Sequence, residues 1–209
     1  MNNKQLESDL KRCLELISAD WKMQNNRFDR ATNFIYKAST LDECLMLIQQ
    51  HRVDRDYALH RWYNYMTSVA AEYLFCEFGA VHEKDVYNHD VDIYIGKVPY
   101  DVKLTIYPAK LSNKPYDLRT RHGKNQMIRW YYENQSQQGR KQLLNRLYIV
   151  CDAETADECL RLKSDFTKLR AKISAFMAYI SKHGLNKIDI TDNGNDYELY
   201  SDIIYITAN

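Results

Sequence analysis

The sequence predicts a single α/β domain with a helical extension at its N-terminus. Glycine and proline are rare, with 6 and 3 among 209 residues, which argues against an all-β protein built on many tight turns. Apolar residues recur at helical spacing near both ends of the chain, whereas in the middle they alternate with polar residues as they do in strands. No linker, repeat or low-complexity segment separates these patterns, so we assign them to one domain and its extension.

The N-terminal extension, residues 1–53, is predicted to be helical. Apolar residues lie four apart within 3–18, which is the spacing of one helix face. Thr40 followed by Glu43 forms a capping-box pattern, which predicts a second helix directly after it. Such helices either pack on the domain that follows or dock a separate partner, and the sequence leaves both open.

The domain itself, residues 54–209, begins with a long helix at 54–78 that Gly79 ends. The period then changes, and three segments rich in Val, Ile and Tyr are predicted to be strands: 80–87, 89–96 and 100–107. The elements expected after them are a basic helix at 120–145, a buried strand at 146–152, a long helix at 155–183 and strands at 187–191 and 199–207.

Composition excludes several classes of protein. No apolar run approaches the roughly 20 residues that a membrane helix needs, and the first residues lack the apolar core of a secretory signal. The five cysteines are odd in number and form no CxxC pair, so they predict free thiols in a reducing compartment, with neither a disulfide framework nor a zinc site. We therefore expect a cytoplasmic protein without a membrane partner.

The net charge of +1 hides a strongly basic middle. Residues 97–146 carry 11 basic and 3 acidic side chains, a balance of +8, whereas both flanking parts are net acidic. Phosphate contacts supply most of the affinity for nucleic acid, so this segment is a candidate DNA-binding surface. A solvated basic face is the alternative interpretation. The candidate contacts are Arg119, Arg121, Lys124, Arg129, Arg140 and Lys141.

One predicted hairpin within the middle gathers acidic residues. Asp90 and Asp92 alternate with apolar residues on its first strand, as do Asp101 and Lys103 on its second. Successive strand side chains point to opposite faces, so all four share the face opposite the apolar residues. A two-residue turn places Asp92 opposite Asp101 and Asp90 opposite Lys103, whereas a longer loop, compatible with Pro99, places Asp92 opposite Lys103.

Two neighbouring carboxylates repel each other unless a positive charge lies between them. Carboxylates with a backbone carbonyl suit Mg²⁺ or Mn²⁺, which keep open positions for water and for a phosphate oxygen. A lysine two residues beyond the second aspartate can orient the attacking water and offset the charge of a phosphodiester transition state. The alternative is a surface hairpin on which Lys103 only neutralises Asp90 or Asp92.

The order of these elements resembles the PD-(D/E)xK nuclease superfamily, whose restriction-endonuclease-like fold has an α-β-β-β-α-β core with a mixed sheet flanked by helices. The resemblance covers roughly residues 55–152. It implies that Asp92 and Asp101 bind the metal, that the Val102 carbonyl is a further ligand and that Lys103 is the catalytic lysine. It also implies that Glu72, on the preceding helix, is an auxiliary ligand or orients a metal-bound water.

Two positions depart from the pattern of this superfamily. Val91 stands where the name of the superfamily has proline, a position that varies among its members. Gln126 is followed four residues later by Trp130, where RecB-like members have tyrosine, and we carry Gln126 over as a candidate catalytic residue. Glu72 lies beside the apolar stripe of its helix, so a solvated boundary glutamate is the alternative to a role in the site.

From the sequence we therefore expect a Mg²⁺-dependent (or Mn²⁺-dependent) nuclease that hydrolyses DNA. A homodimer is compatible with this expectation, since nucleases that cut both strands commonly dimerise. The competing hypothesis is a non-catalytic module of the same fold that binds nucleic acid or a protein.

Overall fold

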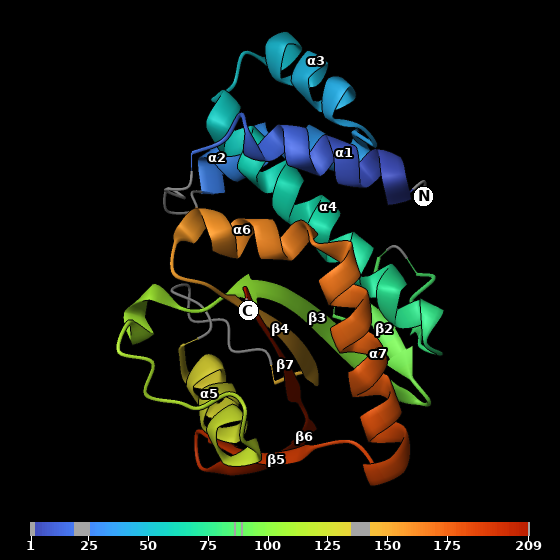
Figure 1. Cartoon of the computed structure of the whole chain (residues 1–209), viewed down its shortest axis with the longest axis vertical. Helices are drawn as coiled ribbons and strands as arrows, with labels where there is room; N and C mark the ends of the chain where they lie inside the picture. The colour runs from blue at the N-terminus through green and yellow to red at the C-terminus, as the bar shows by residue number, and fades with distance from the viewer. Residues whose placement is uncertain (1–2, 19–25, 86, 89, 135–142, 209) are drawn as a thin grey trace.

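A computed structural model describes residues 3–18, 26–85, 87–88, 90–134 and 143–208 of the chain (Figure 1). A mixed five-stranded sheet lies at the centre, with helices on both faces, so the predicted α/β class is confirmed. Within these ranges, no helix is both long and apolar enough to cross a bilayer. The five cysteines are free thiols, as predicted, and four of them are buried.

The described residues before Asp54 are largely helical and lead into the long helix that covers the sheet. Thr40 caps its helix as predicted, because its hydroxyl accepts the Glu43 N–H while the Glu43 carboxylate accepts the Thr40 N–H. Asp54 caps the long helix by accepting the N–H of Tyr57. The elements are α1 (Asn3–Leu14), α2 (Asn26–Ala31), the short 3₁₀ helix η1 (Asn33–Lys37), α3 (Leu41–His51) and α4 (Arg55–Glu77).

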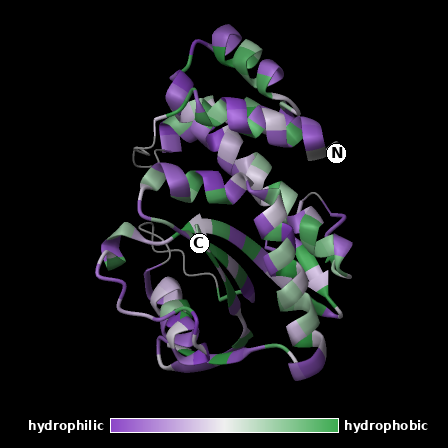
Figure 2. Cartoon of the chain, in the orientation of Figure 1, coloured by the Kyte–Doolittle hydropathy of each residue, from purple (hydrophilic) through white to green (hydrophobic). Residues whose placement is uncertain are grey.

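The sheet has the strand order β1-β2-β3-β4-β7. The pairs β1–β2 and β2–β3 are antiparallel, whereas β3–β4 and β4–β7 are parallel. Apolar residues concentrate in the central strands, whereas the surrounding helices carry both apolar and polar residues (Figure 2). The strands are β1 (Val81–His82), β2 (Ile93–Ile95), β3 (Val98–Ile106), β4 (Arg146–Asp152) and β7 (Asp202–Thr207).

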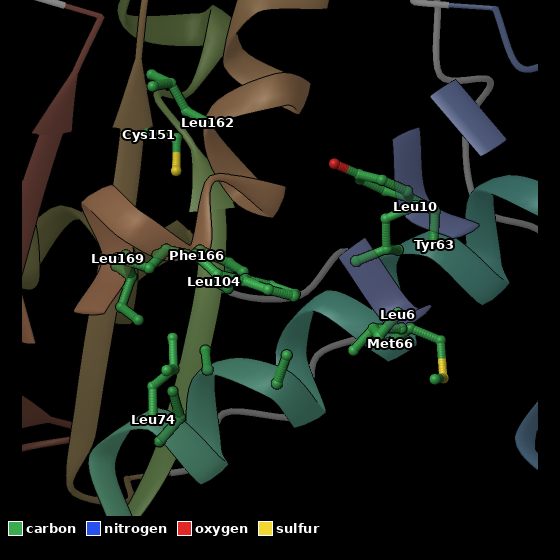
Figure 3. Packing of buried hydrophobic residues seen from close by; sticks show 14 of the residues in the cluster. Leu6, Leu10, Tyr63, Met66, Leu74, Leu104, Cys151, Leu162, Phe166 and Leu169 are labelled. Atoms are coloured by element: carbon green, nitrogen blue, oxygen red, sulfur yellow. The ribbon is translucent and has the colours of Figure 1, made fainter. Parts of the chain in front are cut away.

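The two faces of the sheet have separate cores. Helices α4, α6 (Ala156–Ser164) and α7 (Phe166–His183) cover one face, and the apolar side chains of α1 and α3 extend this core away from the sheet. Figure 3 shows residues of this cluster, among them Leu6, Leu10, Leu104 and Leu169. Helix α5 (Arg121–Asn134) covers the other face with the hairpin β5 (Lys187–Asp192) and β6 (Asn195–Tyr200), and the short 3₁₀ helix η2 (Ala109–Leu111) follows β3.

Most predicted elements are confirmed, but several have other bounds. The strand predicted at 89–96 begins only at Ile93, and the helix predicted at 120–145 is α5 up to Asn134, with residues 135–142 outside the described part of the chain. The predicted strand at 80–87 shrinks to β1, because the Glu83 carboxylate accepts the backbone N–H groups of Lys84 and Asp85 and turns the chain. The helix predicted at 155–183 is two helices, because Asp165 leaves the helical conformation and caps α7. The strand predicted at 199–207 is likewise divided between β6 and β7.

Candidate functional site

The candidate site lies where β2 and β3 separate. Ile93 pairs with Tyr100 around a two-residue turn, so the register of the two-residue turn is observed, but the ladder ends one residue before Asp92 and Asp101 would pair. The Asp92 N–H donates to the Tyr100 carbonyl at 2.8 Å. Beyond this point the Val102 N–H donates to Asp92 Oδ2 at 2.7 Å instead of to a backbone carbonyl of β2. The Asp92 carboxylate therefore satisfies the backbone group that the diverging strands leave without a ladder partner.

Asp90 lies outside the β2–β3 ladder and is not paired with Lys103. Pairing stops at Ile93, so exposed Asp90 lies in the loop before β2 and not opposite Lys103 as one predicted register required. The prediction that four groups alternate along two strands was wrong at this residue, because the strand begins later than the alternation of side chains suggests.

Asp101 is buried and accepts from two cations. Lys103 Nζ lies 2.5 Å from Asp101 Oδ1, and Arg146 Nε lies 2.9 Å from Asp101 Oδ2. The two cations differ in burial, since the side chain of Lys103 is 50% exposed and that of Arg146 only 7%. Arg146 starts β4, where it pairs with Asp101 in the parallel register, and its guanidinium lies 5.7 Å from the centre of the Tyr132 ring. Arg146 therefore holds the carboxylate from inside the protein, and Lys103 meets it from the solvent side.

The carboxylates of Asp92 and Glu72 both have raised pKa values. Burial raises the pKa of Asp92 first, and the nearby Asp101 carboxylate raises it further against the effect of the Val102 hydrogen bond. Burial and then the charge of Asp92 raise the pKa of Glu72 to about 7. Glu72 is buried, so the interpretation of it as a solvated boundary residue was wrong. The protein therefore stabilises the charged forms of Asp92 and Glu72 less well than water does.

His82 is the immediate partner of Glu72. Its Nδ1 lies 2.7 Å from the Glu83 carbonyl oxygen, which can only accept, so Nδ1 carries a proton. Its Nε2 lies 3.0 Å from Glu72 Oε2. The imidazole stacks on the Tyr73 ring, with centroids 4.9 Å apart, which fixes its plane. Glu72 and His82 therefore share one hydrogen-bonded proton at the edge of the site, a pairing that the sequence did not reveal.

A cavity of about 360 Å³ opens beside these groups. Its walls include Glu72, His82 and Asp92, together with the loop that precedes β2. Glu83 holds that loop in place, since its carboxylate accepts from the Asn88 amide and the Tyr94 hydroxyl, both at 2.7 Å. Solvent and a ligand therefore have access to Glu72 and Asp92, the two carboxylates whose charge is least stabilised.

The donor set fits a hard divalent cation in its chemistry, because it consists of carboxylate oxygens and one backbone carbonyl. In the described part of the chain, however, no three Asp, Glu, His or Cys side chains are placed to hold a metal ion together. Asp101 Oδ1 contacts Lys103, and Asp92 Oδ2 accepts from Val102. A cation between the two aspartates would therefore displace the Lys103 ammonium. The ligand roles of Glu72, Asp92, Asp101 and the Val102 carbonyl remain predictions.

The remaining predicted site residues lie elsewhere. Gln126 is exposed on α5, which packs in the other core of the sheet from that of α4 and its Glu72. Arg129 is also exposed on α5, whereas Arg119, Arg121 and Lys124 line a second cavity at β7. Arg140 and Lys141 fall outside the described residues.

The structure thus defines an α/β protein with a mixed sheet, helices on both faces and an acidic group with a lysine where two strands separate. Comparison of the chain with protein families, with curated proteins and with solved structures finds no match. Membership of the PD-(D/E)xK superfamily therefore stays a prediction from the element order and from the residues at this site.

Proposed function

We propose that this protein is a metal-dependent nuclease that hydrolyses DNA phosphodiester bonds. The observation that supports it best is the closeness of the Asp92 and Asp101 carboxylates, with Lys103 Nζ at Asp101 Oδ1, where two strands separate. Mg²⁺ or Mn²⁺, bound by Asp92 and Asp101, would supply an activated water and neutralise charge on the phosphate.

The chain's own residues have distinct tasks in this proposal. The Val102 N–H and the Arg146 guanidinium orient Asp92 and Asp101, respectively, so that neither carboxylate has to be ordered when a cation arrives. Once displaced from Asp101, the exposed Lys103 ammonium is available to offset negative charge on the reacting phosphate. Glu72, with the proton that it shares with His82, lines the cavity through which water reaches Asp92.

A cleavage assay tests this proposal. The protein and its Lys103→Ala variant are incubated with plasmid and with oligonucleotides in Mg²⁺ or Mn²⁺. Lys110→Ala is the matched control, because Lys110 is an exposed lysine of the same basic segment that lies in η2. We expect metal-dependent cleavage that the Lys103 substitution abolishes and the Lys110 substitution leaves intact. Equal cleavage by all three proteins would remove the proposed mechanism.

The second candidate is a non-catalytic module that binds nucleic acid or a protein. The observation that favours it is the double contact of Asp101 with Lys103 and Arg146, which already neutralises that carboxylate. It predicts salt-sensitive binding without cleavage. It also predicts that calorimetry detects no divalent-cation site that Asp92→Asn abolishes, whereas the nuclease proposal predicts such a site.

A further inference from the structure

A second cavity, of about 400 Å³, lies at the β7 edge of the sheet. Helices α5 and α7 pack against β7 from opposite faces, and the cavity lies between them. Its charged lining residues are Arg119, Arg121, Lys124, Lys172 and Asp202. Four cations against one carboxylate give this cavity a formal charge of +3.

One of the four cations is held firmly by its own partners. Arg121 Nη1 lies 2.7 Å from Asp202 Oδ2, and the Asp202 side chain is only 4% exposed. The Arg121 guanidinium also lies 5.7 Å from the centre of the Tyr179 ring, and this ring stacks on His183 on α7. Asp202 is neutralised by Arg121, so the positive charges of Arg119, Lys124 and Lys172 exceed what the carboxylate can balance.

The crowding of positive charge affects Lys124 directly. Burial lowers the pKa of Lys124, and the neighbouring Arg121 and Lys172 lower it further against the attraction of Asp202. An anion in the cavity would stabilise the charged form of Lys124, because it would supply the missing counter-charge in a partly desolvated place. The arrangement is therefore suited to a ligand with more than one negative charge.

We propose that this cavity binds a phosphomonoester group. A phosphomonoester is close to a dianion at neutral pH and offers three acceptor oxygens, whereas a diester within a nucleic acid strand has one charge. The volume of the cavity is also within the range of small-ligand pockets. Phe176, Ile203 and Ile204 supply an apolar part of its lining, which strengthens the charge contacts by excluding water.

The phosphomonoester has two candidate sources, a free nucleotide or the terminal phosphate of a DNA strand, and the second rests on the proposed function. The pairing of the β-strands favours the second source, the terminal phosphate of a DNA strand. Arg146 pairs with Asp101 on one side of β4, and the next residue pairs with Asp202 on the other. The two sites therefore lie at the same level of the sheet, with β3 and β7 roughly 10 Å apart. A strand whose end occupies the cavity can extend towards Asp92 and Asp101.

Binding measurements in EDTA test the inference without any need for cleavage. The probes are a short single-stranded oligonucleotide with a 5′-phosphate, with a 3′-phosphate or with hydroxyl ends, and thymidine 5′-monophosphate. The protein is compared with Lys124→Met, which keeps most of the apolar stem, and with Lys172→Ala. Lys182→Ala is the matched control, because Lys182 is an exposed lysine of α7 that is not among the residues lining this cavity.

We expect one phosphorylated oligonucleotide to bind about tenfold more tightly than the hydroxyl form, and Lys124→Met and Lys172→Ala each to remove most of that difference. Tight binding of thymidine 5′-monophosphate also supports the site and assigns it to a free nucleotide. Equal affinity for phosphorylated and hydroxyl ends, or equal losses in Lys172→Ala and Lys182→Ala, would overturn the inference. Lys103 does not line this cavity, so Lys103→Ala should keep the same ratio of affinities for phosphorylated and hydroxyl ends, and a failed nuclease assay leaves this result interpretable.

Discussion

Replacing Arg146 with methionine tests whether Asp101 depends on its buried partner. The variant keeps much of the aliphatic bulk of Arg146 but leaves the Asp101 carboxylate, 4% exposed, with only the half-exposed Lys103 as a counter-charge. Breaking a buried ion pair by removing one partner costs about 3 to 5 kcal/mol of unfolding free energy. Because Lys103 remains, we expect the lower limit, about 3 kcal/mol.

Arg161→Met is the control for this experiment. Arg161 Nε lies 2.7 Å from Asp157 Oδ2, a similar distance, but both side chains are well exposed. Such a surface pair contributes only about 0.5 kcal/mol. Thermal unfolding of a chain of this size should therefore lose about 10 °C in Tm for Arg146→Met and about 2 °C or less for Arg161→Met. Similar shifts in the two variants would show that burial of the Asp101 pair has no energetic consequence.

Three further changes test other parts of the structure. Asp92→Asn should abolish divalent-cation binding in calorimetry without loss of stability, because the amide oxygen can still accept the Val102 N–H, and a large drop in Tm would contradict this. Gly123→Ala should lower the unfolding free energy by about 2 kcal/mol and weaken phosphomonoester binding, because its Cβ would lie 2.1 Å from the Asp117 carbonyl oxygen at the start of α5. Burial lowers the pKa of Lys163 from 10.5 to about 8. The loss of unfolding free energy that comes from burying its charge is therefore fully present below about pH 8 and disappears as the pH rises towards 10.5. Measured by urea unfolding, the stability of the unmodified chain relative to Lys163→Met should therefore rise by about 2 kcal/mol from about pH 7 to pH 10, and a constant difference would contradict it.

Local patterns predicted the elements that local interactions determine. The capping box at Thr40 predicted the start of α3, and the apolar run at 146–152 predicted β4 with the bounds that the structure has. The alternation around Asp92 and Asp101 predicted that these residues face each other in one of two registers. Pro99 did not exclude the observed register, although proline cannot donate a hydrogen bond to the ladder.

The parts that the sequence did not reveal depend on long-range packing. Arg146 reaches Asp101 only because β3 and β4 pair in parallel, and Lys172 joins Lys124 only because α5 and α7 meet at β7. The burial of Glu72 depends on which side of α4 packs on the sheet, and helical periodicity placed this residue at the boundary. Such contacts join residues far apart in the sequence, so spacing along the chain carries no signal for them.

A crystal soaked with Mn²⁺ tests the central claim most directly, because manganese is located by its anomalous scattering. The nuclease proposal predicts a peak between the carboxylates of Asp92 and Asp101, with the Lys103 ammonium moved away from Asp101 Oδ1. Absence of a peak at saturating Mn²⁺, with Lys103 still on Asp101, would contradict the proposal that these carboxylates bind a catalytic metal ion.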